Sequence, residues 1–190
     1  GGTIYGNVGK LPIHEEAMTN PICSYGISKL MIEKYLYLYH RLYGLDYRTA
    51  RLSNAYGERQ GRTSNQGLIT TMLNKVLQDQ TLKIWGDGSV VRDYVYVKDA
   101  VRCIQKILLY EGPERIFNVS SNKGYSVNEV IEEIRKVTGK KIKITYGKER
   151  KFDVRDNILS NVLAQKELGW EPTVSLNEGM TQVYNWLKTE

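Results

Sequence analysis

A long helical pattern, from Ser24 to Tyr43, is the feature that most restricts how this chain can fold. Apolar residues recur along it at the spacings of one helix face, and Gly44 follows as a typical helix end. Short strand patterns and further helical patterns then alternate to the end of the chain. This alternation predicts an α/β fold, in which helices pack against a sheet.

The other expected elements cover most of the chain. Ser126 and Glu129 have the spacing of a capping box, and Gly139 marks the end of the helix that they start. Ser24 and Asp99 are expected to cap two further helices. Helices are expected at 24–43, 68–78, 99–110, 126–137 and 176–188, and strands at 1–5, 47–52, 82–85, 90–97, 116–119 and 142–146.

The long helix carries more apolar surface than one buried face requires. One stripe of aliphatic residues is expected to face the core, and core packing is also the expected role of three central tyrosine rings. The stripe consists of Ile27, Met31, Leu38 and Leu42, and the rings are those of Tyr35, Tyr37 and Tyr39.

Tyr25 and Lys29 are four residues apart near the start of this helix, so both side chains project from one face. The charge of Lys29 would favour the phenolate form and lower the pKa of the Tyr25 phenol. A tyrosine with a lowered pKa can remove a proton from a hydroxyl group near neutral pH. Two other pairs have the same spacing, Tyr94 with Lys98 and Tyr184 with Lys188.

Composition limits the partners and the compartment. The net charge of +6 favours an anionic partner, either nucleic acid or a nucleotide diphosphate. The basic residues are dispersed and form no nucleic-acid-binding motif, so nucleic acid is disfavoured. Cys23 and Cys103 lack the spacing of a metal site, and their low number fits a reducing cytoplasm. The cysteine spacing therefore predicts no bound metal. No apolar run is long enough to span a membrane, so no membrane partner is expected.

Four motifs follow one another in register along the chain: G-T-I-Y-G at 2–6, S-Y-G-I-S-K at 24–29, R-L-S-N-A-Y-G at 51–57 and G-D-G-S-V-V-R-D-Y at 86–94. Together they resemble the extended short-chain dehydrogenase/reductases. Within this group, the sequence looks most like the NAD-dependent nucleotide-sugar epimerases of the UDP-glucose 4-epimerase type.

The resemblance implies the C-terminal part of a Rossmann-like doubly wound parallel sheet, plus a smaller α/β substrate-binding domain. Residues 1–57 would be the remainder of the dinucleotide-binding domain, and 58–190 mainly the substrate domain. Whether the segment around 90–110 packs back on the first domain is left open. The G-x-G at Gly86 and Gly88 does not join a buried strand to a helix, so it is not the family's cofactor loop. We therefore expect that loop to lie upstream, and this fragment to be inactive by itself.

The resemblance also implies a reaction. Tyr25 would take a proton from a sugar hydroxyl while a hydride moves from the same carbon to NAD, and the hydride would later return to the opposite face of a keto intermediate. Lys29 would lower the pKa of the phenol and bind the nicotinamide ribose. Leu52 would be a further cofactor contact.

The third catalytic hydroxyl is expected two or four residues before Tyr5. Gly1 occupies the farther position and has no hydroxyl, so Thr3 is assigned. The related 4,6-dehydratases carry Thr-Asp-Glu where this chain has Gly1, Gly2 and Thr3. Because the two acids that move protons during elimination are absent, a dehydratase is disfavoured.

Most of the substrate residues are likewise implied by the resemblance, and several have a plainer alternative. Asn54 could be only a turn residue, Arg92 could pair with Asp93, and Arg150 with Asp153 could form a surface ion pair. The free amides that begin the helix at 68–78 suit a diphosphate, as does a bidentate arginine. The expected contacts are Asn54, Gln66, Leu68, Trp85 beside the uracil, Arg92, Arg150 and Asp153.

Three functions stay open at this point. The first is a UDP-hexose 4-epimerase, the second a related nucleotide-sugar reductase or decarboxylase, and the third, for this fragment alone, a non-catalytic module that binds a sugar nucleotide. The resemblance further implies a homodimer formed through the helix at 24–43.

Overall fold

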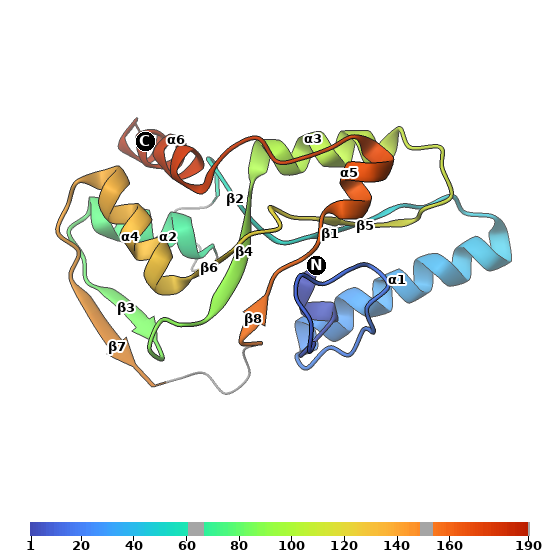
Figure 1. Cartoon of the computed structure of the whole chain (residues 1–190), viewed down its shortest axis with the longest axis horizontal. Helices are drawn as coiled ribbons and strands as arrows, with labels where there is room; N and C mark the ends of the chain where they lie inside the picture. The colour runs from blue at the N-terminus through green and yellow to red at the C-terminus, as the bar shows by residue number, and fades with distance from the viewer. Residues whose placement is uncertain (61–66, 149–153, 190) are drawn as a thin grey trace.

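The computed structural model describes residues 1–60, 67–148 and 154–189. Its helices are η1 (Gly2–Ile4, a 3₁₀-helix), α1 (Ser24–Tyr43), α2 (Leu68–Leu77), α3 (Val97–Leu108), α4 (Val127–Thr138), α5 (Val162–Leu168) and α6 (Leu176–Thr189). Its strands are β1 (Thr49–Leu52), β2 (Asn54–Tyr56), β3 (Leu82–Trp85), β4 (Val91–Tyr96), β5 (Ile116–Val119), β6 (Gly124–Ser126), β7 (Ile144–Gly147) and β8 (Asp156–Asn157). Figure 1 shows their arrangement.

The strands pair in three groups, most of them parallel. β1 pairs with β5, β3 pairs with β7, and β4 lies between β2 and β6 and also pairs with β8. Among these, only the pairing of β4 with β6 is antiparallel. The α/β fold with parallel strands is therefore confirmed.

Two larger cores and a smaller one hold these elements together. The first packs α2, α4 and α6 over β3 and β4, and the second packs α3 and α5 over β5. Figure 1 shows the first group of helices at one end of the molecule and the second group towards the other. α3 also contacts β1 and β2. The division of the chain at residues 57 and 58 stays a prediction.

The third core fixes the beginning of the chain, where a strand was expected at 1–5. The structure has η1 there instead, with the amides of Ile4 and Tyr5 bonded to the carbonyls of Gly1 and Gly2. Ile4 and Tyr5 are both fully buried, together with Ile13 and Leu159. Consecutive residues of a strand point to opposite faces, so a turn buries this pair more readily than a strand.

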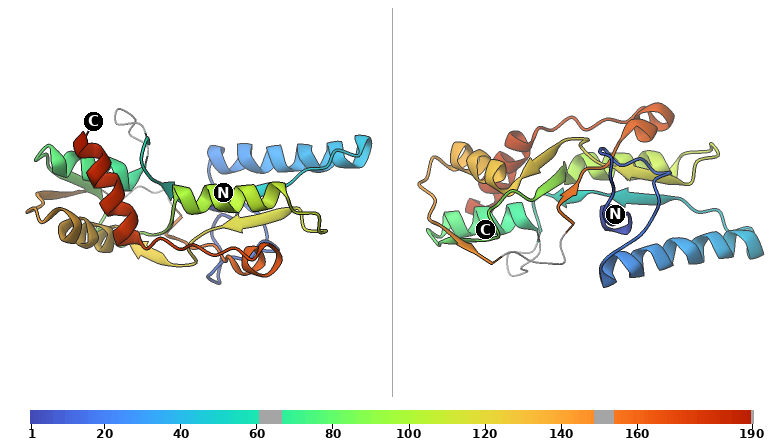
Figure 2. Two further views of the ribbon diagram at one scale, coloured as in Figure 1. Left: turned by 90° about the horizontal axis from the view of Figure 1, so that it is seen from above. Right: turned by 60° about the horizontal axis from the view of Figure 1, so that its bottom comes forward.

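α1 has the predicted bounds, and Gly44 ends it with φ of 69°. The prediction that its apolar stripe and tyrosine rings pack in the core was wrong. All seven of these side chains are exposed, and Gly26 is the one fully buried residue of the helix. Figure 2 shows α1 beside the β1–β5 pair, with much of its length clear of the rest of the chain. Its N-cap is Cys23 rather than Ser24, because the Cys23 thiol accepts a hydrogen bond from the Gly26 amide at 3.4 Å.

The ends of α4 were predicted correctly from local sequence motifs, whereas the start of α3 was not. The Ser126–Glu129 capping box is present in both directions, and Gly139 ends α4 with φ of 64°, as predicted. Asp99 does not cap α3, which begins at Val97. Its buried carboxylate instead accepts hydrogen bonds from the segment at 173–174, and so holds the chain between α5 and α6 against α3.

Candidate functional site

Two cavities meet at Tyr25. The larger has a volume of about 540 Å³ and is lined by Tyr25, Asn54, Ala55, Tyr56, Gln60, Gly67, Leu68, Ile69, Met72, Lys83, Ile84, Trp85, Val90, Arg92, Tyr94 and Val127. The smaller, of about 370 Å³, is lined by Gly1, Ile4, Tyr25, Lys29, Ile32, Glu33, Leu36, Thr49, Ala50, Arg51, Leu52, Ser53 and Ala55. Tyr25 therefore faces both spaces, and most of the predicted site residues in the described part of the chain line one or the other.

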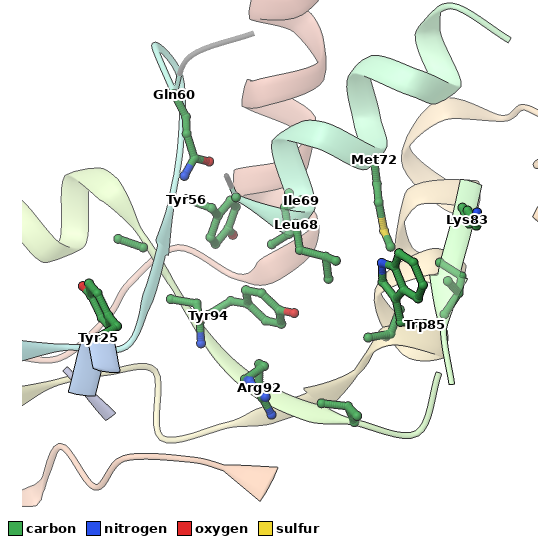
Figure 3. Close-up of a pocket in the computed structure, with 16 residues that line it drawn as sticks. Tyr25, Tyr56, Gln60, Leu68, Ile69, Met72, Lys83, Trp85, Arg92 and Tyr94 are labelled. Atoms are coloured by element: carbon green, nitrogen blue, oxygen red, sulfur yellow. The ribbon is translucent and has the colours of Figure 1, made fainter. Parts of the chain in front are cut away.

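Tyr25 and Lys29 lie together in the first turns of α1. The Lys29 ammonium lies over the Tyr25 ring, 5.4 Å from its centroid. The Ser28 hydroxyl donates to the Tyr25 carbonyl at 2.8 Å, so that side chain supports the helix rather than the phenol. The Tyr25 side chain is half exposed and stands at one end of the larger cavity (Figure 3).

The other two Tyr-x-x-x-Lys pairs have different geometry. Tyr94 belongs to β4 and Lys98 to α3, so they do not share a helix face, and the Lys98 ammonium pairs with Glu58 at 3.2 Å. Burial raises the pKa of Tyr94 to about 12, so its hydroxyl stays protonated near neutral pH. Tyr184 is buried in α6 and lines neither cavity. Tyr25 is thus the tyrosine of the three that combines helical spacing with a place in both cavities.

The predicted third hydroxyl has an unusual environment. The Thr3 Oγ1 atom is buried and has no hydrogen-bond partner within the described residues, yet Thr3 is absent from both linings. Its carbonyl packs on α1 at Gly26, where an added Cβ would lie 2.7 Å from the Thr3 oxygen. The Ser53 hydroxyl is also buried without a described partner, and Ser53 does line the smaller cavity. Sequence reasoning missed this hydroxyl, although its place directly after a strand was a usable signal.

The junction of β1 and β2 lies between the two cavities. Leu52, the last residue of β1, lines the smaller one, and Asn54, the first residue of β2, lines the larger one. The Asn54 amide group donates to the Asp93 carbonyl at 2.9 Å, which fixes its orientation. These two predicted contacts therefore line different cavities, both of which Tyr25 also lines.

Arg92 and Asp93 do not form the ion pair that was the plainer alternative. Neighbouring residues of a strand point to opposite faces. The buried Asp93 carboxylate accepts hydrogen bonds from the Ser121 amide and hydroxyl and from the Leu159 amide. The Arg92 guanidinium lines the larger cavity and donates to the carbonyls of Val91 at 2.8 Å and Arg155 at 3.1 Å.

The far end of the larger cavity is formed by β3 and the start of α2. Trp85 is 46% exposed, and its ring lies opposite Leu68 and Met72 (Figure 3). Lys83 lies on the same strand face as Trp85, 5.4 Å from the indole centroid. Gly67 is the N-cap of α2, with φ of 85°, and forms no side-chain cap among the described residues. Lys83, Met72 and Tyr94 line the cavity but were not predicted. The alternation at 82–85 places Lys83 on the same strand face as Trp85, so the sequence could have identified Lys83 as a lining residue. Met72 and Tyr94 have the sequence pattern of ordinary core residues.

Three predicted contacts, Gln66, Arg150 and Asp153, lie outside the described residues. Within the described ranges, no group of three or more His, Cys, Asp or Glu residues is placed to hold a metal ion. In the same ranges, no helix is both long and apolar enough to cross a bilayer.

A family model described as GDP-mannose 4,6 dehydratase matches residues 2–183, nearly the whole chain. The chain belongs to this family. Membership confirms the resemblance carried by the four sequence motifs, and it agrees with the Rossmann-like α/β class expected from them.

Curated relatives of this family member differ in the reaction that their names describe. A dTDP-4-dehydro-6-deoxyglucose reductase of Escherichia coli is 37% identical over 184 residues, which are 96% of this chain and 58% of that protein. A UDP-glucose 4-epimerase of Mycolicibacterium smegmatis is 32% identical over 190 residues, which are 100% of this chain and 61% of that protein.

Two solved structures resemble the family member along almost all of its length. A UDP-glucose 4-epimerase of Thermotoga maritima, crystallised with UDP-glucose, has a TM-score of 0.95 and 38% identity, and the match covers 100% of this chain and 61% of that one. A UDP-glucose 4-epimerase of Thermus thermophilus in complex with NAD has a TM-score of 0.90 and 29% identity, with 98% and 61% covered. The chain thus spans about three fifths of the proteins that it matches.

Proposed function

We propose that the natural protein that carries this chain is an NAD-dependent nucleotide-sugar epimerase, acting at C4 of a UDP-hexose. The observation that carries this proposal is the position of Tyr25, which lies in the linings of two adjoining cavities with Lys29 over its ring. A proton acceptor at this point can serve a substrate in one cavity and a redox cofactor in the other. Relatives named UDP-glucose 4-epimerases, one with UDP-glucose and one with NAD, support this reading.

The larger cavity suits a nucleotide sugar. Arg92 supplies a positive charge, and the start of α2 supplies backbone amides, two features that favour a diphosphate. Trp85 offers an indole face for a flat base. We place the hexose at the other end, beside Asn54 and Tyr25.

The smaller cavity suits the nicotinamide end of NAD. Its lining includes Thr49 and Ser53, whose hydroxyls are buried without partners among the described residues. Lys29 and Leu52 line the same space, in agreement with their predicted cofactor contacts. NAD would supply a hydride acceptor that later returns the hydride.

This chain's own residues would handle the proton. The Tyr25 oxygen accepts it from the C4 hydroxyl as that carbon is oxidised, and gives it back as the carbon is reduced. Lys29 offsets the negative charge that the Tyr25 oxygen carries before it accepts the proton and again after it gives the proton back. Thr3 stays our candidate for the third hydroxyl.

The exposed apolar surface of α1 fits the predicted homodimer. The four stripe residues Ile27, Met31, Leu38 and Leu42 are each more than 40% exposed. Such a continuous apolar surface is typical of an interaction site. We therefore propose that part of this surface pairs with a second copy, in a protein of the cytoplasm.

The test uses the intact natural protein with NAD and UDP-glucose. We expect a mixture with UDP-galactose and no net change in NADH absorbance. The reductase named among the relatives supports keeping a second candidate, a nucleotide-sugar reductase. Such an enzyme would consume NADH in step with its substrate. Absence of any UDP-hexose interconversion would rule out the epimerase. The 190-residue chain alone is expected to be inactive and to bind NAD weakly, and micromolar binding by calorimetry would contradict that expectation.

A further inference from the structure

Glu33 lies on the face of α1 that the rest of the chain covers. Gly26 and Leu30 precede it on this face, at helical spacings of three and four residues. The Glu33 side chain is only 12% exposed. An apolar residue is the usual choice at such a position, so a carboxylate there requires a specific partner.

That partner is Arg51 of β1. Its guanidinium donates two hydrogen bonds to the Glu33 carboxylate, at 3.0 and 2.7 Å, and its side chain is 5% exposed. A third nitrogen donates to the Tyr5 hydroxyl at 2.7 Å and to the Glu15 carbonyl at 3.1 Å. The Tyr5 hydroxyl in turn donates to Asn118 of β5 at 2.9 Å. The pair therefore connects α1 to β1, to β5 and to the segment that follows η1.

The connection lies one helical turn beyond Lys29. Tyr25, Lys29 and Glu33 are spaced by four residues, and all three line the smaller cavity together with Arg51. Nearer its start, α1 is also held within the described chain by its contact with η1 at Gly26 and by Leu30, which packs against the third core. The two reactive side chains thus lie on a helix that is fixed at both ends of the stretch that carries them.

A buried ion pair seldom adds net stability compared with two apolar residues, but its two-pronged geometry admits a single alignment. We propose that Glu33 and Arg51 are a positioning pair, which sets the rotation and the axial position of α1 and hence the places of Tyr25 and Lys29 between the cavities. The catalytic part of this inference rests on the proposed epimerase function.

The main test replaces both charges in the intact natural protein, as Glu33→Leu with Arg51→Met. This double variant keeps an apolar contact and should fold, with a Tm close to that of the natural protein. Because small misplacements of reacting groups are costly, we expect kcat to fall by about tenfold or more, while KM for UDP-glucose changes by less than about twofold. The control, Asp46→Asn, removes an exposed carboxylate that pairs with Arg48 and Arg115 and should change neither value.

Amide hydrogen exchange supplies a readout that does not depend on turnover. We expect faster exchange over residues 25–33 in the double variant and natural rates in the control. If the natural protein converts no UDP-hexose, the proposed function fails, and the exchange rates still decide whether the pair fixes α1. Natural exchange rates in the double variant would overturn the positioning role. A kcat within about twofold of the natural value would overturn it equally.

Discussion

The ammonium group of Lys29 lies 5.4 Å from the centroid of the Tyr25 ring, where the two cavities adjoin. If the Tyr25 oxygen carries the proton, Tyr25→Phe should lower kcat by about 10²- to 10⁴-fold in the intact protein. UDP binding, measured by calorimetry, should change little, because Tyr25 lies at one end of the larger cavity. Turnover within about twofold of the natural protein would exclude Tyr25 as the proton acceptor.

Tyr184→Phe is the matched control for that experiment. Tyr184 belongs to another Tyr-x-x-x-Lys pair, with the Lys188 ammonium 4.5 Å from its ring centroid, but it lines neither cavity. Its loss should leave kcat unchanged. An equal loss of activity in both variants would point to damaged folding rather than to missing chemistry.

Arg92 provides a second prediction, on binding. Replacing Arg92 with Leu should weaken UDP binding by about 10- to 100-fold, since hydrogen bonds to charged groups contribute roughly 1.5–3 kcal/mol. Arg92→Lys keeps the positive charge but loses the bidentate guanidinium, so a smaller loss of UDP affinity is expected. Arg135→Gln, in an exposed pair with Glu132 on α4, should bind UDP like the natural protein. A Kd for Arg92→Leu equal to that of this control would remove Arg92 from the site.

The capping box of α4 gives a prediction with a definite pH dependence. Hydrogen bonds from the Ser126 amide and hydroxyl lower the pKa of Glu129. Their stabilising contribution is fully present above the ordinary glutamate value of about 4.3, and is lost as the pH falls through the lower folded value. Ser126→Ala should therefore cost about 1 kcal/mol near neutral pH, and less in acid.

Thermal unfolding of the intact protein at several pH values measures this difference. Thr181→Ala is the control, because its hydroxyl bonds only within α6, to the Asn177 carbonyl at 2.8 Å. It should lower Tm little at any pH. A Ser126→Ala effect that stays constant across the acid range would show that the Ser126 hydroxyl does not favour the charged form of Glu129.

The exposed stripe of α1 gives a prediction about assembly. Leu38→Glu places a charge in the proposed interface and should convert the dimer to a monomer at micromolar concentration, as measured by light scattering. Leu108→Glu changes an even more exposed leucine, at the end of α3, and should leave the dimer intact. If the natural protein is itself monomeric, the proposed pairing is wrong.

The sequence could predict those parts of the fold that depend on contacts between residues close together in the chain. The capping box at Ser126 and Glu129 depends on four consecutive residues, and it was predicted correctly. Asp99 was assigned to the same kind of local role and was wrong, because its partners lie at 173–174. A local sequence pattern does not indicate a contact between residues so far apart in the chain.

The stripe on α1 shows a different limit. Periodicity indicates that one helix face is apolar, but it does not indicate which surface covers that face. Leu38 and Tyr37 were expected in the core and are exposed. The prediction of a strand at 1–5 was wrong for a related reason, because the sequence pattern did not show that Ile4 and Tyr5 are buried in the same core.

The candidate site was predicted as separate residues rather than as a shape. Motif resemblance named Asn54, Trp85 and Arg92, and the fold brings all three to the larger cavity. The Glu33–Arg51 pair was missed, because a contact between side chains of α1 and β1 exists only after the chain has folded.

The tight approach of η1 to α1 restricts what mutation can do at residue 26. Even alanine would bring its methyl group within 2.7 Å of the Thr3 oxygen and 2.9 Å of the Pro21 ring. A saturation library at this codon, selected for turnover, should return glycine almost alone. The position next to the proposed proton acceptor is thereby closed to evolutionary change, through its packing against η1 and Pro21.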